Sequence, residues 1–470
     1  MGDTSQSTAG NRAAVHSGES EARGAMPERI IQWQQYNQTI LHPCTVVLVL
    51  LAGVLIFMLP RRLVPIPILT ASLFVTEVQR VVIAGLDFNV MRIMAILAWM
   101  RVVLRGETRR FTLTPLDKAL IVWTVSDTLF YTLLMGTSQA FVNRLGHALN
   151  GLGLYLVLRF LIRSFDDVRR MVKILVALSI PVMAAMVIEH IWGRNIFSVF
   201  GGVPEYTVVR AGRLRAQAAF MHPILAGTFG ASLIPLCVLL WYRGGSRPIA
   251  SAGLLAGTVI AFASASSGPV LGYLSAFAAL AAWPLRRRMR LVRWTIGLTL
   301  LGLHLVMKAP VWALINRVAV VGGSTAYHRY KLIDEFIRHF SDWWLCGSTK
   351  AGTWGWGLQD ITNHYVLQGL NGGLLTLICF IAVVVAGFRC VGRSLRLCRG
   401  MYPEERMAWC LGCALFVHAV SFFGVSYFDQ IILVWYLLLA LIATFYLEAQ
   451  KRAAEAQAAA AEEELLFVPA

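Results

Sequence analysis

The sequence predicts an all-α polytopic membrane protein: a bundle of about 12 transmembrane helices (roughly 11 to 14), with two functional outer loops and an interfacial amphipathic helix in the longer loop. Two observations predict this class. Hydrophobic residues make up 57% of the 470 residues and charged residues only 14%, whereas a soluble domain has about 45–50% and about 25%. The apolar residues also form blocks long enough to cross lipid. Soluble globular, disordered and collagen-like classes are therefore excluded.

The apolar blocks divide the chain into a polar N-terminal tail (1–43), one transmembrane domain (44–447) and a polar tail rich in Ala and Glu (448–470). The first tail has no apolar stretch of the kind found in a cleavable signal peptide, so no such peptide is expected. The last tail is expected to be a solvated helix or disordered. The expected spans are 44–59, 63–76, 89–104, 119–135, 147–163, 171–191, 224–241, 249–265, 268–284, 291–307, 372–388, 408–425 and 430–447. Pro60, Pro65 and Pro67 interrupt the first ones, which favours a re-entrant pair or half-helices there.

The basic residues between the spans predict the orientation. They lie in alternate loops, which the positive-inside rule assigns to the cytoplasm, and most of the net charge of +17 is explained in this way. A nucleic-acid partner is therefore not expected. The two longest connections, 192–223 and 308–371, then lie on the outer face. The basic loops carry Arg105, Arg109, Arg110 and Lys118; Arg163, Arg169, Arg170 and Lys173; Arg243 and Arg247; Arg286, Arg287, Arg288, Arg290 and Arg293; and Arg389, Arg393, Arg396, Arg399 and Arg406.

The longer outer loop contains an amphipathic pattern with helical spacing. A connection of this length in a protein of otherwise tight turns is usually functional. The pattern is typical of a helix that lies in the membrane interface, or of one that caps the bundle, and the sequence leaves both open. Its apolar face holds Leu332, Ile333, Phe336, Ile337, Phe340, Trp343 and Trp344, and its polar face holds Lys331, Asp334, Glu335, Arg338 and Asp342.

Arginines on the outer face run against the positive-inside trend. The 192–223 loop has three of them within six residues, Arg210, Arg213 and Arg215. Arginine binds phosphate through two parallel hydrogen bonds and stays charged at any relevant pH. The arginines of the two loops are therefore candidates for a pyrophosphate site at the membrane surface: Arg213, Arg215, Arg317, Arg329 and Arg338. The alternatives are contact with anionic lipid headgroups, or pairing with Glu205, Asp334, Glu335 and Asp360.

Other catalytic signatures are missing from the sequence. No Asp-x-Asp pair and no His, Cys or Asp set with metal-ligand spacing occurs, so no metal site or cofactor is expected, and arginines would take the place of a metal. No Walker sequence or catalytic serine elbow is present. The Cys410-x-x-Cys413 pair lies inside an apolar span and is expected to serve packing.

Several stretches between residues 80 and 447 together resemble the superfamily of O-antigen ligases and Wzy-type polymerases, which are glycan transferases of the bacterial inner membrane. The resemblance rests on their order and on their shared outer location. The stretches are 215–227 (RAQAAFMHPILAG), 266–269 (SSGP), 324–329 (STAYHR), 343–347 (WWLCG), 360–365 (DITNHY) and 372–374 (GGL).

The resemblance implies a metal-independent, inverting transferase. It would move a glycan from undecaprenyl-pyrophosphate to a lipid, glycan or protein acceptor on the periplasmic face. Membrane lipids are expected as further partners. Arg215 and Arg329 would bind the pyrophosphate, with Arg213, Arg338 and Arg317 in support. The family's histidine, a proposed general base, corresponds to His364, one residue later than in the family's His-Asn pattern. Further candidates for the site are His222, His328, Asp360 and Asn363.

Two other functions remain open. A polymerase of lipid-linked repeat units for O-antigen or exopolysaccharide shares the donor and differs only in the acceptor. A transporter of polysaccharide or lipid-linked sugars is the alternative from another class; it predicts inverted repeats and discontinuous helices near the bilayer midplane. No clear internal repeat is visible, and the ionisable residues gather in the outer loops, which favours a transferase.

Overall fold

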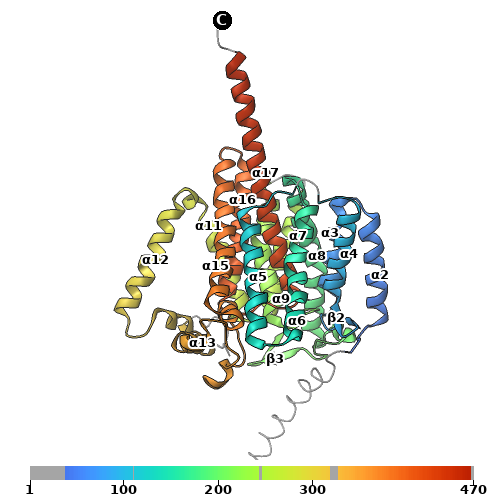
Figure 1. Ribbon diagram of the computed structural model, residues 1–470, viewed down its shortest axis with the longest axis vertical. Helices are drawn as coiled ribbons and strands as arrows, with labels where there is room; N and C mark the ends of the chain where they lie inside the picture. Colours follow the sequence, from blue (N-terminus) through green and yellow to red (C-terminus); the bar gives the residue numbers. More distant parts are fainter. Residues whose placement is uncertain (1–37, 109–110, 243–245, 318–325, 467–470) are drawn as a thin grey trace, which may run out of the picture.

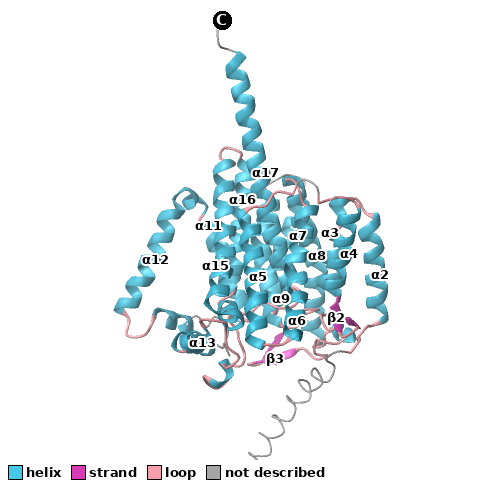
Figure 2. Cartoon of the chain, in the orientation of Figure 1, coloured by secondary structure: helices cyan, strands magenta, loops and turns pink. Residues whose placement is uncertain are grey.

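The computed structural model describes residues 38–108, 111–242, 246–317 and 326–466. The fold is all-α apart from two short hairpins (Figure 2). Within the described residues, six helices are long and apolar enough to cross a membrane, and three further apolar helices are shorter. The predicted class of helical membrane protein is therefore confirmed. Residues 1–37, 318–325 and 467–470, with Arg109, Arg110 and Arg243, lie outside the described residues.

Every expected span overlaps a helix. The span expected at 63–76 is α3, whose 10 residues are too short to cross a bilayer, so the half-helix alternative describes it. The final helix runs on into the tail rich in Ala and Glu. The helices are α2 (Pro43–Met58), α3 (Pro65–Phe74), α4 (Val90–Leu104), α5 (Pro115–Met135), α6 (Ser138–Ala148), α7 (Leu154–Leu161), α8 (Phe165–Trp192), α9 (Pro223–Trp241), α10 (Arg247–Ala263), α11 (Ser267–Ala281), α12 (Met289–Val306), α13 (Ala326–Arg338), α14 (Phe340–Trp343), α15 (His364–Leu397), α16 (Tyr402–Ser421) and α17 (Ile431–Leu466).

Local sequence signals set the ends of several helices. α5 begins with a capping box, in which the Thr114 hydroxyl accepts from the Asp117 N–H and the Asp117 carboxylate accepts from the Thr114 N–H. The same helix ends at Gly136, which has a φ of 63° that favours glycine. α8 begins in a similar way at Ser164, whose hydroxyl accepts from the Asp167 N–H.

The core is built around α9, which packs against α8, α10, α11, α16 and α17. Its sequence is apolar on all sides, as expected for a helix enclosed by others. α15 packs on α5, and α17 packs on α7 and α15. α12 stands apart from the bundle (Figure 1), has no buried residue, and is joined to the rest by the short 3₁₀ turns Trp283–Arg288 and Val311–Arg317.

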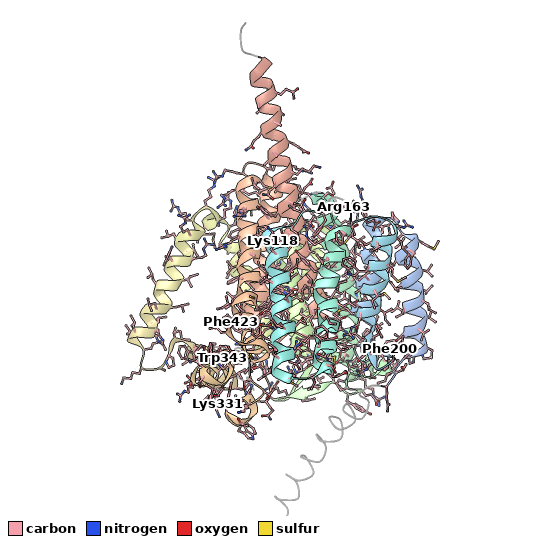
Figure 3. All side chains as sticks on the ribbon, in the orientation of Figure 1. Lys118, Arg163, Phe200, Lys331, Trp343 and Phe423 are labelled. Atoms are coloured by element: carbon pink, nitrogen blue, oxygen red, sulfur yellow. The ribbon has the colours of Figure 1, made fainter. Side chains whose placement is uncertain are left out.

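The two long connections lie together at one end of the bundle, which we call the loop end. Lys118 and Arg163, from two of the basic loops, lie at the opposite end (Figure 3), while Phe200, Lys331 and Trp343 lie at the loop end. The hairpins β1 (Arg80–Ile83) with β2 (Leu86–Asn89), and β3 (Val208–Arg210) with β4 (Arg213–Arg215), are also at the loop end. This arrangement agrees with the alternation of basic and poorer loops along the sequence.

The amphipathic segment of the longer loop caps the bundle. The Leu332 and Phe336 side chains of α13 are buried against Leu358, Val366 and Leu370. Trp343 of the short helix α14 stacks on the Phe336 ring at 3.9 Å, and its indole N–H donates to the Phe336 carbonyl at 2.7 Å. The apolar face therefore packs largely on the protein itself.

One assignment to the polar face of this segment was wrong. Asp334, expected on the solvated face, is buried, because its carboxylate accepts hydrogen bonds from the Trp312 indole (3.1 Å) and from Arg338 (2.9 Å). Ile337, Phe340 and Trp344, expected on the apolar face, are exposed.

The contact between α9 and α10 depends on glycine. A Cβ atom on Gly230 would lie 2.7 Å from the carbonyl oxygen of Gly257, and one on Gly257 would lie 2.8 Å from that of Gly230. We predict that Gly230→Ala lowers the free energy of unfolding by about 1–3 kcal/mol, because backbone atoms must move. Thermal unfolding of the purified protein in detergent measures this. Gly302→Ala in α12 is the matched control, since nothing lies within 4 Å of its Cβ position; equal loss in both variants would contradict the packing argument.

Candidate functional site

A hairpin at the loop end carries three arginines on one face. Strands β3 and β4 pair so that Arg210 lies opposite Arg213 and Val208 lies opposite Arg215. Ala211 and Gly212 form the turn, with φ values of 49° and 71°. Because side chains alternate along a strand and directly opposed residues share a face, Arg210, Arg213 and Arg215 project from the same side. Like charges placed directly opposite each other destabilise a hairpin unless an anion neutralises them.

Arg215 is buried at the junction of two helices. It is 6% exposed, and its Nε donates to the Ser264 carbonyl at 3.4 Å, just beyond the C-terminus of α10. Its Nη2 donates to the Ser266 hydroxyl at 2.8 Å, immediately before α11. Carbonyls at a helix C-terminus carry partial negative charge and attract cations. They hold this guanidinium without neutralising it.

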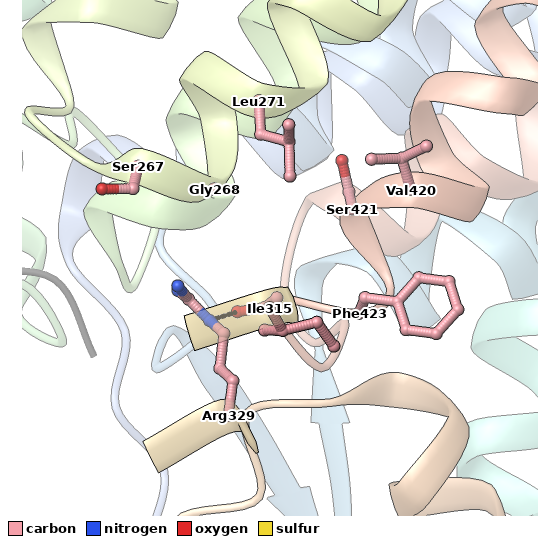
Figure 4. Close-up of a pocket in the computed structure, with 9 residues that line it drawn as sticks. Ser267, Gly268, Leu271, Ile315, Arg329, Val420, Ser421 and Phe423 are labelled. Carbon is pink, nitrogen blue, oxygen red and sulfur yellow. Dashed lines mark hydrogen bonds between the residues drawn. The ribbon is translucent and has the colours of Figure 1, made fainter. Parts of the chain in front are cut away.

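Arg329 approaches the same region from α13 in the other long connection. It is 8% exposed, and its Nε donates to the Gly424 carbonyl at 3.2 Å, beyond the end of α16. Its guanidinium points toward the first turn of α11 (Figure 4). Together these groups line a small pocket between α11, α13 and the end of α16, whose residues are Ser267, Gly268, Leu271, Ile315, Arg329, Val420, Ser421, Phe423 and Gly424.

The arginines of the two loops repel one another. Burial and, to a smaller extent, the nearby Arg210 charge lower the pKa of Arg215 to about 10. The same two causes, in the same order, lower the pKa of Arg329. Among the described residues none of Arg210, Arg213, Arg215 and Arg329 forms an ion pair with a carboxylate. Arginine is charged at any relevant pH, so a cluster of arginines that pairs with no carboxylate of the described residues suits an anion.

Two buried carboxylates hold the loop that joins Arg215 to α9. One Glu189 oxygen accepts from the backbone N–H groups of Gln217 (3.0 Å) and Ala218 (2.8 Å). The Asp429 carboxylate accepts from the Met221 N–H at 2.7 Å. Sequence reasoning missed both residues, although an acidic residue at the end of an apolar span is a recognisable signal for a buried polar partner.

His222 lies at the N-terminus of α9, close to Arg215 and Arg210. Its Nδ1 accepts from the Ile224 N–H at 3.1 Å, so the ring acts as the N-cap of the helix. Burial, followed by the Arg215 and Arg210 charges, lowers its pKa to about 4. The ring is therefore neutral near pH 7, and since Nδ1 accepts a hydrogen bond, the proton is on Nε2, which can act as a donor.

His364 does not join the arginines. It is buried at the first turn of α15, stacked on the Phe422 ring with centroids 4.9 Å apart, and its Nδ1 accepts from the Tyr427 N–H at 3.1 Å. Asn363 caps the same helix, since its side-chain oxygen accepts from the N–H groups of Tyr365 and Val366. The base role of His364 stays a prediction.

The remaining predicted residues lie elsewhere in the longer loop. His328 contacts the Asp360 carbonyl through Nε2 at 3.0 Å; His328 is half-buried and Asp360 is exposed. Arg338 is paired with Asp334 at 2.9 Å and faces solvent. The side chain of Arg317 lies outside the described residues. The structure thus brings together Arg215, Arg329 and His222, with Arg213 on the same hairpin face, and adds Arg210.

No cluster of three or more His, Cys, Asp or Glu side chains suited to a metal ion occurs in the described part of the chain. Comparison with known protein families finds no family that the chain matches. Comparison with proteins of curated function finds no protein of significantly similar sequence.

The neutral state of His222 predicts a pH dependence of stability. A histidine whose folded pKa of about 4 lies below its usual value of about 6.5 resists protonation in the folded state. Stability is then lost as the pH falls from about 6.5 to about 4, by at most about 1.4 kcal/mol per pH unit. His222→Asn keeps the N-cap and removes the titration. Thermal unfolding in detergent from pH 7.5 to 4.5 measures the effect; parallel curves for both proteins would contradict it.

Proposed function

We propose that the protein is a membrane glycosyltransferase of the O-antigen ligase type, which transfers a glycan from undecaprenyl-pyrophosphate to an acceptor without a metal. The observation that supports this most directly is the convergence of three arginines from two separate connections: Arg215, Arg329 and Arg210. None of them forms an ion pair with a carboxylate of the described residues. A site with that much unbalanced positive charge at the end of a membrane bundle suits a lipid that carries several negative charges.

A pyrophosphate fits this arrangement better than a single carboxylate does. Arg215 and Arg329 are each held through Nε by a backbone carbonyl. Among the described residues, their Nη groups make only one hydrogen bond, from Arg215 to Ser266, and the Arg329 guanidinium points toward the first turn of α11 (Figure 4). Two guanidinium groups fixed in this way can each contact one phosphate of the pair, and burial strengthens both contacts.

The chemistry that follows is a single displacement. The acceptor hydroxyl oxygen forms a bond to the anomeric carbon, while the bond from that carbon to the phosphate oxygen breaks and the electron pair leaves with the pyrophosphate. Arginines stabilise the negative charge that develops on the leaving group. The hydroxyl proton passes to a base, the role that the family resemblance gives to His364.

The proposal also includes the topology. The helices cross the bacterial inner membrane about 12 times, and the loop end faces the periplasm. This sidedness is supported by the basic residues at the opposite end of the bundle, which the positive-inside rule places in the cytoplasm. Polymerisation of lipid-linked repeat units uses the same donor site and differs only in the acceptor.

Reconstituted protein tests the proposal. Vesicles containing the protein and a polyprenyl-pyrophosphate-linked oligosaccharide, with lipid-linked and free glycan acceptors, are assayed for glycan transfer in the presence of EDTA. We predict that Arg215→Gln and Arg329→Gln each lower the transfer rate by about 100-fold or more, because a charge that stabilises the leaving group is lost. Arg287→Gln, on the exposed turn before α12, is the matched control.

Three results would each contradict part of this proposal. Full transfer by both site variants rules out the arginine assignment. Loss of activity with EDTA in the wild-type protein rules out metal-independent transfer. A donor that stays intact with acceptors present but crosses the vesicle bilayer identifies a transporter instead.

A further inference from the structure

The first turn of α11 forms one wall of the pocket that Arg329 lines, and Ser266, the residue just before this turn, binds Arg215. An α-helix leaves its first backbone N–H groups without partners inside the helix, and a side chain at the N-cap usually satisfies one of them. Here the N-cap residue Ser266 does not cap the helix. Its hydroxyl donates to the Ser264 carbonyl at 2.8 Å and accepts from Arg215. The Ser266 hydroxyl, which would normally cap this helix, is therefore engaged by Arg215 and the Ser264 carbonyl instead.

Gly268 is the residue of this turn that faces the opening. Its N–H makes no hydrogen bond to any described residue, and it lines the pocket. A Cβ atom at this position would lie 3.9 Å from Nη2 of Arg329, and 3.9 Å from Cγ2 of Ile224. Glycine therefore leaves open the space beside the Arg329 guanidinium that a Cβ atom would fill.

A second, independent observation points to a ligand at this helix end. Arg329 is more than nine-tenths buried, its Nη atoms have no partner among the described residues, and its guanidinium is directed at this turn (Figure 4). A buried cation without a counter-charge and an uncapped helix N-terminus both favour an anion. Arg329 and Gly268, whose N–H belongs to this turn, line the same pocket.

We infer that the first turn of α11 is the third arm of the anion site: the Gly268 N–H binds a phosphoryl oxygen that Arg329 contacts at the same time. The inference rests on the proposed function, and it deepens that function by assigning the ligand's phosphate to a backbone donor. A backbone N–H is fixed by the helix and does not reorient as charge develops on the leaving group, so it adds stabilisation that flexible side chains do not.

Gly268→Ala tests this assignment with little effect on the fold. Apart from its chain neighbours and its own helix backbone, no described atom lies closer than 3.9 Å to the position of the new methyl carbon, which is an ordinary contact, and alanine favours a helix. The methyl occupies the space in which the phosphoryl oxygen would lie. Gly297→Ala in α12 is the matched control, because nothing lies within 4 Å of its Cβ position and it is remote from the pocket.

The experiment is a calorimetric titration of the full-length protein in nanodiscs of neutral lipid with inorganic pyrophosphate. We expect the affinity to fall at least tenfold in Gly268→Ala and to stay within twofold of wild type in Gly297→Ala. Wild-type binding with equal affinity in Gly268→Ala overturns the inference and leaves the arginine site standing. Absence of pyrophosphate binding to the wild-type protein overturns both the inference and the proposed function.

A second measurement covers the case in which Gly268→Ala fails to fold. When the protein is labelled with ¹⁵N-glycine and with ¹³C at the serine carbonyl, only the amides of Gly18 and Gly268 follow a labelled carbonyl, and Gly18→Ala leaves Gly268 as the single such signal. We expect this amide signal to shift and saturate with pyrophosphate. A signal that does not move overturns the inference.

One further measurement distinguishes the two possible sources of the phosphate, a membrane lipid headgroup and the pyrophosphate of a donor. The titration is repeated in nanodiscs that contain phosphatidylglycerol. If pyrophosphate affinity falls in the wild-type protein but not in Gly268→Ala, the site also takes the phosphate of a membrane lipid headgroup through Gly268. Unchanged wild-type affinity assigns it to the pyrophosphate of a donor. Both results support a phosphoryl oxygen at the turn.

Discussion

Arginine charge held by backbone carbonyls is the interaction on which the loop end depends. Arg215 is anchored beyond the C-terminus of α10 and Arg329 beyond the C-terminus of α16, each through Nε. A carboxylate in either place would neutralise the guanidinium and close the site, whereas carbonyl dipoles orient it and leave the charge for a ligand. The breaks between α10 and α11, and between α16 and α17, supply these carbonyls.

The surrounding structure opposes the repulsion among these cations. Glu189 and Asp429 fix the backbone between Arg215 and α9 with hydrogen bonds from three N–H groups. The cap on α9 is the His222 ring, whose pKa is low because it is buried beside Arg215 and Arg210. The hairpin, the loop and the start of α9 are thus joined by hydrogen bonds into one segment, so that the proposed anion would meet groups already in position.

The position of α13 determines how the second long connection contributes. Leu332 and Phe336 anchor one side of this helix on residues of α15 and its preceding loop. Arg329, three residues before Leu332, is thereby directed inward under the first turn of α11. An amphipathic helix free in the membrane interface would have no fixed relation to the hairpin. Packing on the bundle converts two loops that are distant in sequence into one site.

The sequence by itself determined the membrane class, nearly all helix positions, and the concentration of arginines in two connections, because apolar block length and charge placement are local properties of the chain. It did not determine which arginines meet. Arg338 lies in the same connection as Arg329, yet it pairs with the carboxylate of Asp334, four residues earlier in the helix. Arg210 joins the site because the hairpin register places it opposite Arg213. His364 matches a motif and lies among aromatic rings. Only tertiary packing decides such outcomes, since burial and partners arise from residues far apart in the chain.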